Sequence, residues 1–149
     1  MKKFIIVISL VLMALLLRFY FLGKESQKMT VDTGLRDGVL RTCESEDHCF
    51  HSDQVKDEID WITSEHINEE ILDEIVKEGE AMGWKLVKKE GPYLHFTAKS
   101  KIFGFVDDIE FHYHEEMGEL HFRSESRVGK SDLGANEARI RKILEKVSQ

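Results

Sequence analysis

The tripeptide Gly129-Lys130-Ser131 has residue types that could do chemistry, because glycine, lysine and serine in this order occur in phosphate-binding loops. The Walker motif needs a further glycine five positions before Gly129, and Ser124 stands there. Such loops also follow a parallel strand of a βαβ unit, whereas this stretch follows the last of several strands joined by short turns. We therefore exclude a nucleotide hydrolase of this type.

The two cysteines, Cys43 and Cys49, could form a disulfide or bind a metal. Together with His48 and His51 they place four possible zinc ligands within nine residues. The five residues between the cysteines exceed the two to four that are usual in zinc sites. An oxidising compartment favours the disulfide, which the spacing also supports better than it supports zinc.

Histidines on alternate strand positions form a second candidate metal site. If the turns at residues 103–104 and 115–118 hold two and four residues, His95, His112 and His121 form one row across three strands. Three imidazoles in a row could hold zinc or copper with an open position. The alternative is the solvated face of a one-sided sheet, and a slip of one residue in register would destroy the row.

A third group centres on Asp107, which shares the core-facing parity of its strand with apolar residues. The same four-residue turn places Asp107 opposite Ser126, and Asp108 points to the other face, so the two carboxylates cannot act jointly on one substrate. A buried carboxylate needs donors and a cation, and Arg139 is the natural partner. We expect a buried polar clasp of Asp107, Ser124, Ser126, Asn136 and Arg139 that locks the last helix to the sheet.

An anion pocket is the alternative interpretation of the same stretch. Gly129 and Gly134 would free backbone N–H groups at the start of the last helix, with charge from Arg127 and Lys130. The clasp or pocket together comprises Asp107, Arg123, Ser124, Ser126, Arg127, Gly129, Ser131, Asp132, Gly134, Asn136 and Arg139. Neither serine has a histidine at a convincing position for nucleophilic catalysis.

Short strands and amphipathic helices must position these residues. Residues 59–63 alternate like a strand, and Asn68 could cap a helix with a buried stripe of Ile71, Leu72, Ile75, Val76 and Met82 that Gly83 ends. Strands follow at residues 84–89, 93–100, 106–114 and 120–126, and then a final helix runs to the C-terminus. This order of elements predicts an α+β two-layer sandwich, in which two helices pack on one face of an antiparallel meander. The same order of elements occurs in helix-grip folds.

The N-terminus predicts a membrane segment. Residues 4–22 are apolar except for Ser9 and Arg18, follow two lysines and are nearly long enough to span a bilayer. Bulky residues at the end of the run favour an uncleaved signal-anchor over a cleaved signal peptide, and Lys2 and Lys3 favour a cytoplasmic start. We expect a transmembrane helix at 1–22, a tether at 23–42 and an extracytoplasmic domain at 43–149, periplasmic in a bacterium, with an exported and cleaved protein as the alternative.

The stretches FGFVDDIEF and RSESRVGKSDLGANEARI resemble the signature blocks of the family called domain of unknown function 1499. The second block follows the pattern R-S-x-S-R-x-G-x-S-D-x-G-x-N-x-x-R at every fixed position, and Asp107 and Asp108 form the aspartate pair of the first. CESEDHC is similar to the family's start, although Asp47 and His48 stand where proline and asparagine are common. The resemblance implies a small exported, membrane-anchored or plastid protein and no established activity.

Charge and composition narrow the function further. Residues 23–149 carry a net charge of −10, which excludes the basic surface of a typical nucleic-acid binder and leaves a solvated acidic face or a site for cations or a basic partner. We expect a membrane-anchored, non-catalytic binding or interaction module without a cofactor, using the outer sheet face or the pocket at residues 123–139 for a protein partner or small anion. The alternatives are a metal-dependent enzyme using the histidine row and a purely structural envelope component.

Overall fold

The computed structural model describes residues 1–29, 31–55 and 69–148. Its elements in chain order are α1 (Lys2–Ser26), β1 (Leu35–Arg36), β2 (Val39–Leu40), β3 (Cys49–His51), the 3-10 turn η1 (Ser52–Gln54), α2 (Ile71–Ala81), β4 (Lys85–Glu90), β5 (Tyr93–Lys99), β6 (Val106–His114), β7 (Glu119–Ser126) and α3 (Ala135–Val147). The predicted strand at residues 59–63 and the predicted cap Asn68 lie outside the described residues.

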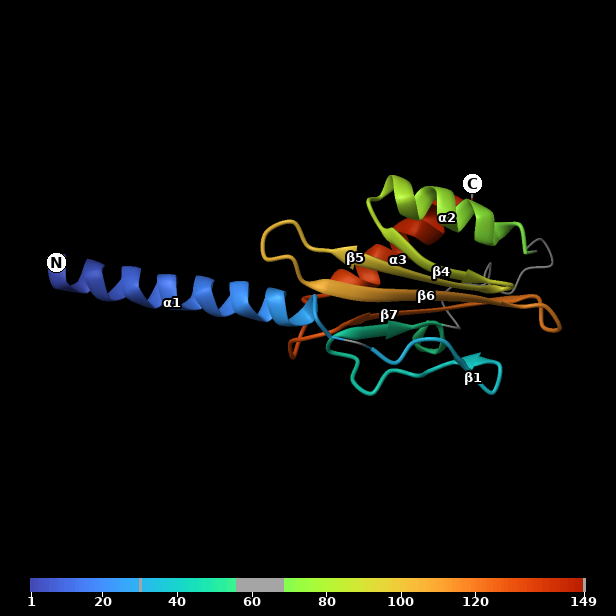
Figure 1. Cartoon of the computed structure of the whole chain (residues 1–149), viewed down its shortest axis with the longest axis horizontal. Coiled ribbons are helices and arrows are strands. Elements are labelled where there is room, and N and C mark those ends of the chain that lie inside the picture. Colours follow the sequence, from blue (N-terminus) through green and yellow to red (C-terminus); the bar gives the residue numbers. More distant parts are fainter. Residues whose placement is uncertain (30, 56–68, 149) are drawn as a thin grey trace.

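The domain is a two-layer α+β structure, as the sequence predicted. Five antiparallel strands form one sheet in the order β3-β7-β6-β5-β4, and α2 and α3 cover one of its faces (Figure 1). Four of these strands are the predicted meander, and the fifth is β3, which pairs with β7. Cys49, the last residue of the segment 43–49 that we call the disulfide segment, is therefore the first residue of an edge strand. This strand has only three residues, which is too few for alternation to predict it.

The core lies between the helices and the sheet, and its periodicity matches the sequence. Alternate residues of β6 and β7 point to the helices because side chains alternate across a strand. Trp84, which follows α2 in the chain, is buried in this core and packs its ring against Phe96 and Phe111. The fully buried residues of the layer include Leu72, Ile75, Leu94, Phe96, Ile109, Phe111, Leu120, Phe122, Ile140, Ile143 and Leu144. The predicted α2 residues Val76 and Met82 are partly buried against this core.

Much of the opposite face of the sheet is also buried, at His95, Asp108, Glu110, His112 and Arg123, and the prediction of a solvated face was wrong there. The β1–β2 hairpin lies over this face (Figure 1), where Leu40 is buried. The Gly34 N–H donates to Glu110 Oε1 at 2.7 Å, and Arg41 reaches Glu125 at 2.9 Å. Gly34, Leu40 and Arg41 of the predicted tether are thus held against the sheet. Their cover is held by hydrogen bonds and ion pairs, so it has no hydrophobic periodicity from which it could be recognised.

Helix α1 projects from one end of the domain and runs four residues past the predicted limit at Leu22 (Figure 1). The helix has 25 residues, and an 18-residue window within it has a mean hydropathy of 2.6, which makes it long and apolar enough to cross a membrane. At its C-terminal end Gly23 touches the β5–β6 connection. A Cβ atom at Gly23 would lie 2.0 Å from the carbonyl oxygen of Phe103, so only glycine permits this approach.

Candidate functional site

The adjacent aspartates of the first signature block each bind an arginine, on opposite faces of the sheet. Asp107 points to the helical layer, where its Oδ2 accepts a hydrogen bond from Arg139 Nη2 at 2.6 Å. Asp108 points to the hairpin layer, where Arg127 donates to both its oxygens at 2.7 and 2.9 Å. Alternation along β6 explains the split, and each pair joins the sheet to a different helix.

The expected clasp residues of the helical face lie together. Asp107 stands opposite Ser126, as predicted from the four-residue turn that follows β6. Arg139 Nη1 also donates to Ser124 Oγ at 3.2 Å and to Asn136 Oδ1 at 2.6 Å. Ser124 Oγ donates to Asn136 Oδ1 at 2.6 Å, and Asn136 Nδ2 donates to Ser126 Oγ at 3.1 Å. These hydrogen bonds fix the start of α3 against β7.

The second pair, Asp108 with Arg127, holds the end of α1. Arg127 Nη1 donates to the carbonyl oxygens of Met29 at 3.0 Å and Ser26 at 3.4 Å, where backbone acceptors are left free as the helix ends. Burial alone would raise the pKa of Asp108. The hydrogen bonds from Arg127, and one from His95 Nε2 at 2.8 Å, outweigh the effect of burial and hold the pKa of Asp108 below its usual value. The hydrogen bonds to Asp108 raise the pKa of Arg127 in turn.

Arg123 lies on the hairpin face and is 1% exposed, as is its partner Glu110. Arg123 Nη1 donates to Glu110 Oε2 at 2.7 Å, and its Nη2 contacts Glu125. Tyr93 donates its hydroxyl proton to Glu110 Oε1 at 2.7 Å. Burial and this hydrogen bond raise the pKa of Tyr93, which keeps the hydroxyl protonated. Burial lowers the pKa of Arg123, and the neighbouring Glu110 opposes that shift.

Several of the groups expected to bind an anion at the start of α3 are engaged within the chain. Asp132 accepts hydrogen bonds from the Gly134 N–H at 3.0 Å and the Asn136 N–H at 2.7 Å through its carboxylate, and its carbonyl accepts the Ala135 N–H at 3.2 Å. It therefore caps the helix where an anion would sit. Ser131 Oγ accepts from the Leu133 N–H at 3.3 Å. Gly129 and Lys130 are exposed.

The histidine row does not form, because the register between β5 and β6 differs from the assumed one. Ser100 and Phe105 close a four-residue turn through a backbone hydrogen bond of 2.8 Å, where a two-residue turn was expected. His95 consequently stands opposite Glu110, while His112 still stands opposite His121. Burial, followed by the two neighbouring histidines, lowers the pKa of His112. Within the described part of the chain no three His, Cys, Asp or Glu side chains are placed to hold a metal ion.

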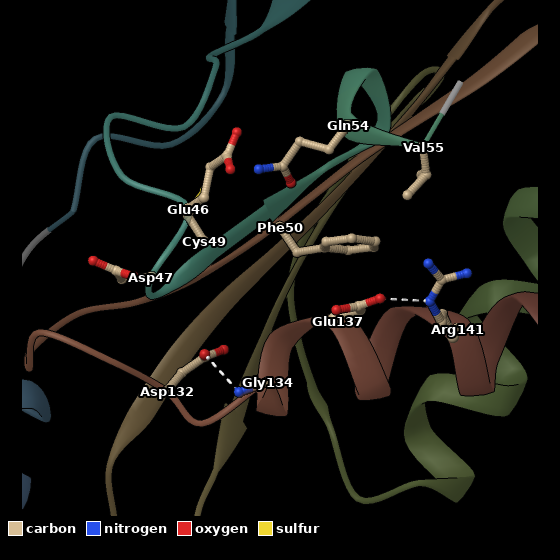
Figure 2. Close-up of a pocket in the computed structure, with 10 residues that line it drawn as sticks. All are labelled: Glu46, Asp47, Cys49, Phe50, Gln54, Val55, Asp132, Gly134, Glu137 and Arg141. Carbon is tan, nitrogen blue, oxygen red and sulfur yellow. Dashed lines mark hydrogen bonds and ion pairs between the residues drawn. The ribbon is translucent and has the colours of Figure 1, made fainter. Parts of the chain in front are cut away.

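Cys43 and Cys49 form the disulfide that was preferred over zinc ligation. Beside this disulfide a cavity of about 360 Å³ opens between the disulfide segment and α3 (Figure 2). Its lining residues are Glu46, Asp47, Cys49, Phe50, Gln54, Val55, Asp132, Gly134, Glu137 and Arg141. Of these, Cys49, Asp132 and Gly134 were among the predicted site residues.

Four carboxylates make this cavity acidic. Glu46 and Asp47 approach it from the disulfide segment, and Asp132 and Glu137 approach it from the α3 side, with Phe50 between them (Figure 2). Glu137 pairs with Arg141 at 2.8 Å. The acidic run before Cys49 was visible in the sequence, but nothing there placed it beside α3.

Fold and site together define a class: an α+β domain behind an N-terminal apolar helix of the kind found in membrane anchors and signal sequences, with a disulfide that indicates an oxidising compartment. Residues 39–147 match the model of the family described as Protein of unknown function (DUF1499), and the chain belongs to this family. No curated protein matches the chain, and no solved structure does.

Proposed function

We propose that this protein is a single-pass membrane protein whose extracytoplasmic domain is a non-catalytic binding module. Helix α1 would be an uncleaved anchor, and Lys2 and Lys3 favour a cytoplasmic start that sends the domain outside. The Cys43–Cys49 disulfide agrees with an oxidising compartment. The contacts of the Phe19 ring with Phe103 and Phe105 support retention of the anchor, because cleavage at the end of the apolar run would remove Phe19 from the domain.

The observation that carries the non-catalytic assignment is the engagement of the charged signature residues within the chain. Asp107 and Asp108 each bind an arginine, Arg123 binds Glu110, and Asp132 caps α3. A general acid or base needs a free site within hydrogen-bond reach of a substrate. The signature residues instead join sheet, α3 and the end of α1, which is a structural use.

The acidic cavity beside the disulfide is the binding site that the structure supports best. Its volume of about 360 Å³ lies at the lower end of the range for small-ligand sites, and an aromatic ring stands between its acidic walls. Four carboxylates against one arginine favour a ligand with a basic group, such as a lysine or arginine side chain of a protein partner. This assignment replaces the outer sheet face, which the hairpin covers, and the anion pocket, because Asp132 occupies the backbone donors at the start of α3.

Binding can be tested with a fluorescein-labelled Gly-Arg-Arg-Gly peptide and the full chain in uncharged detergent micelles. We expect fluorescence anisotropy to show salt-sensitive binding that falls about tenfold or more in the triple variant Glu46→Gln/Asp47→Asn/Glu137→Gln, because each lost contact with a cation is worth on the order of 1 kcal/mol. Asp132 stays unchanged because it caps α3.

The matched control removes the same charge elsewhere, as Glu74→Gln/Glu80→Gln/Glu90→Gln, which are exposed positions outside the cavity lining. Equal losses in both variants would mean general charge attraction and would contradict a site in the cavity. Anchoring is tested separately by alkaline extraction of membranes and by intact mass. An uncleaved, oxidised chain of 17.3 kDa in the membrane fraction is expected, and a shortened chain released by extraction would contradict the anchor.

A further inference from the structure

The β5–β6 connection, residues 100–105, exposes apolar and basic side chains next to α1. Ile102 is 85% exposed at its tip, and Lys101 beside it is exposed as well. Phe103 and Phe105 follow and are only half-buried. Ile102 and the half-buried Phe103 and Phe105 together form a partly exposed apolar surface, which indicates a contact site where a single exposed side chain would not.

Aromatic contacts fix this connection against the membrane-spanning part of α1. The ring of Phe103 lies 5.4 Å from the ring of Phe19, and the ring of Phe105 lies 6.4 Å from it, measured between centroids. Gly23, one helical turn further on, touches the Phe103 carbonyl. The connection therefore lies beside the last turns of the apolar helix, at the end of the domain from which α1 emerges (Figure 1).

Hydrogen bonds hold the same contact in one position. Gln27 Nε2 donates to the Gly104 carbonyl at 2.9 Å, and the Val106 N–H donates to Ser26 Oγ at 3.1 Å. Lys99 Nζ donates to Gln27 Oε1 at 3.2 Å. Because both ends of the connection are tied to α1, its depth relative to a bilayer follows from the position of the helix.

The position of α1 places the connection at the lipid interface. Residues 4–22 span about 28 Å as a helix, close to the thickness of a bilayer core, so the core ends near Leu22. Phe19 lies one turn inside that limit, and Phe103 contacts it. Aromatic rings are favoured at this depth, and nearby lysines are attracted to anionic headgroups. Lys24 and Lys28 lie at the end of α1, Lys99 binds Gln27 beside them, and Lys101 lies in the connection itself.

From these contacts we infer that residues 100–105 are a second membrane contact, in which Ile102 and Phe103 insert into the lipid interface beside α1 and hold the domain against the membrane surface. This inference rests on the anchoring role proposed for α1. The occupant is the lipid bilayer itself, since the exposed apolar surface of Ile102 continues the apolar surface of α1, and the basic residues around it complement anionic lipid.

The test measures the depth of nitroxide labels on the full chain in vesicles of phosphatidylcholine and phosphatidylglycerol at a ratio of 7:3. Separate variants, Ile102→Cys, Met117→Cys and Leu12→Cys, are labelled with the native disulfide intact, and collisions with oxygen and with a nickel chelate report depth. Met117 is 52% exposed in the turn at the other end of β6 and serves as the matched control.

We expect the label at position 102 to lie about 5–10 Å below the headgroup surface, while the label at 117 remains in water. A label at 102 as accessible to nickel as the label at 117, with the label at 12 deep in the bilayer, would overturn the interfacial contact and leave the anchor intact. A label at 12 in water would overturn the anchor and the interfacial contact together.

Discussion

Removing Arg139 tests whether the signature residues of the helical face form a structural clasp. In Arg139→Ala the side chain that bridges Asp107, Ser124 and Asn136 is lost. The Asp107 carboxylate stays within the domain, where its side chain is 11% exposed, and it loses its ion-pair partner. The alanine itself is well tolerated by a helix, so the effect reports on the clasp.

The size of the effect follows from these contacts. Breaking a buried ion pair on one side costs about 3–5 kcal/mol, because a charge is left without a partner in a medium that solvates it poorly. The Arg139 side chain keeps 15% of its surface exposed, so water can reach the vacated space in part. We therefore expect the free energy of unfolding to fall by about 3 kcal/mol.

Urea unfolding of the full chain in mild detergent, followed by tryptophan fluorescence, measures this change. Trp84 reports on the core because it packs against Phe96 and Phe111. At a urea dependence typical of a domain of this size, 3 kcal/mol lowers the midpoint by about 1.5–2 M. Arg141→Ala is the control, since Arg141 pairs with Glu137 where both side chains are more than 40% exposed, and it should change stability by less than about 1 kcal/mol.

A double-mutant cycle decides whether the stranded charge is the cause. Arg139→Ala should cost less in an Asp107→Asn background, because an amide is far cheaper to leave unpaired than a carboxylate. A loss below about 1 kcal/mol in Arg139→Ala alone, or an equal loss in both backgrounds, would refute the buried-pair argument.

Three further changes test other contacts. Gly23→Ala should lower the free energy of unfolding by about 1–3 kcal/mol, because the new Cβ meets the Phe103 carbonyl, and an unchanged urea midpoint would contradict that contact. Folding lowers the pKa of Asp108, so ionisation of this carboxyl stabilises the folded protein above about pH 4. This stabilisation is lost as the pH falls through the pKa that Asp108 has in the folded state. Asp108→Asn should therefore be less stable at pH 7 and lose less stability than the native chain during acid titration. Reduction of the Cys43–Cys49 disulfide should lower the free energy of unfolding by about 2 kcal/mol, because the disulfide closes only a short loop. Dithiothreitol should therefore shift the urea midpoint of the native chain and leave that of a double-serine variant unchanged.

Local patterns in the sequence predicted the parts of the fold that depend on neighbouring residues. Alternation placed Asp107 and Asp108 on opposite faces, and a four-residue turn after β6 set Asp107 opposite Ser126. The α2 stripe and the disulfide followed from spacing in the same way. Each of these features is encoded within a short stretch, where the backbone period decides which side chains meet.

Only the tertiary structure decided which segment covers the outer face of the sheet and which residues far apart in the sequence contact one another. The histidine row failed because a hydrogen bond between Ser100 and Phe105 set a four-residue turn, and a register change of two residues moved His95 to face Glu110. The hairpin cover has no apolar periodicity, since polar contacts such as Gly34 with Glu110 hold it. The sequence by itself determined the helices, most of the sheet and the clasp. Packing between distant segments determined the buried polar face, the joint at the end of α1 and the acidic cavity, because those contacts depend on loop geometry that no local period encodes.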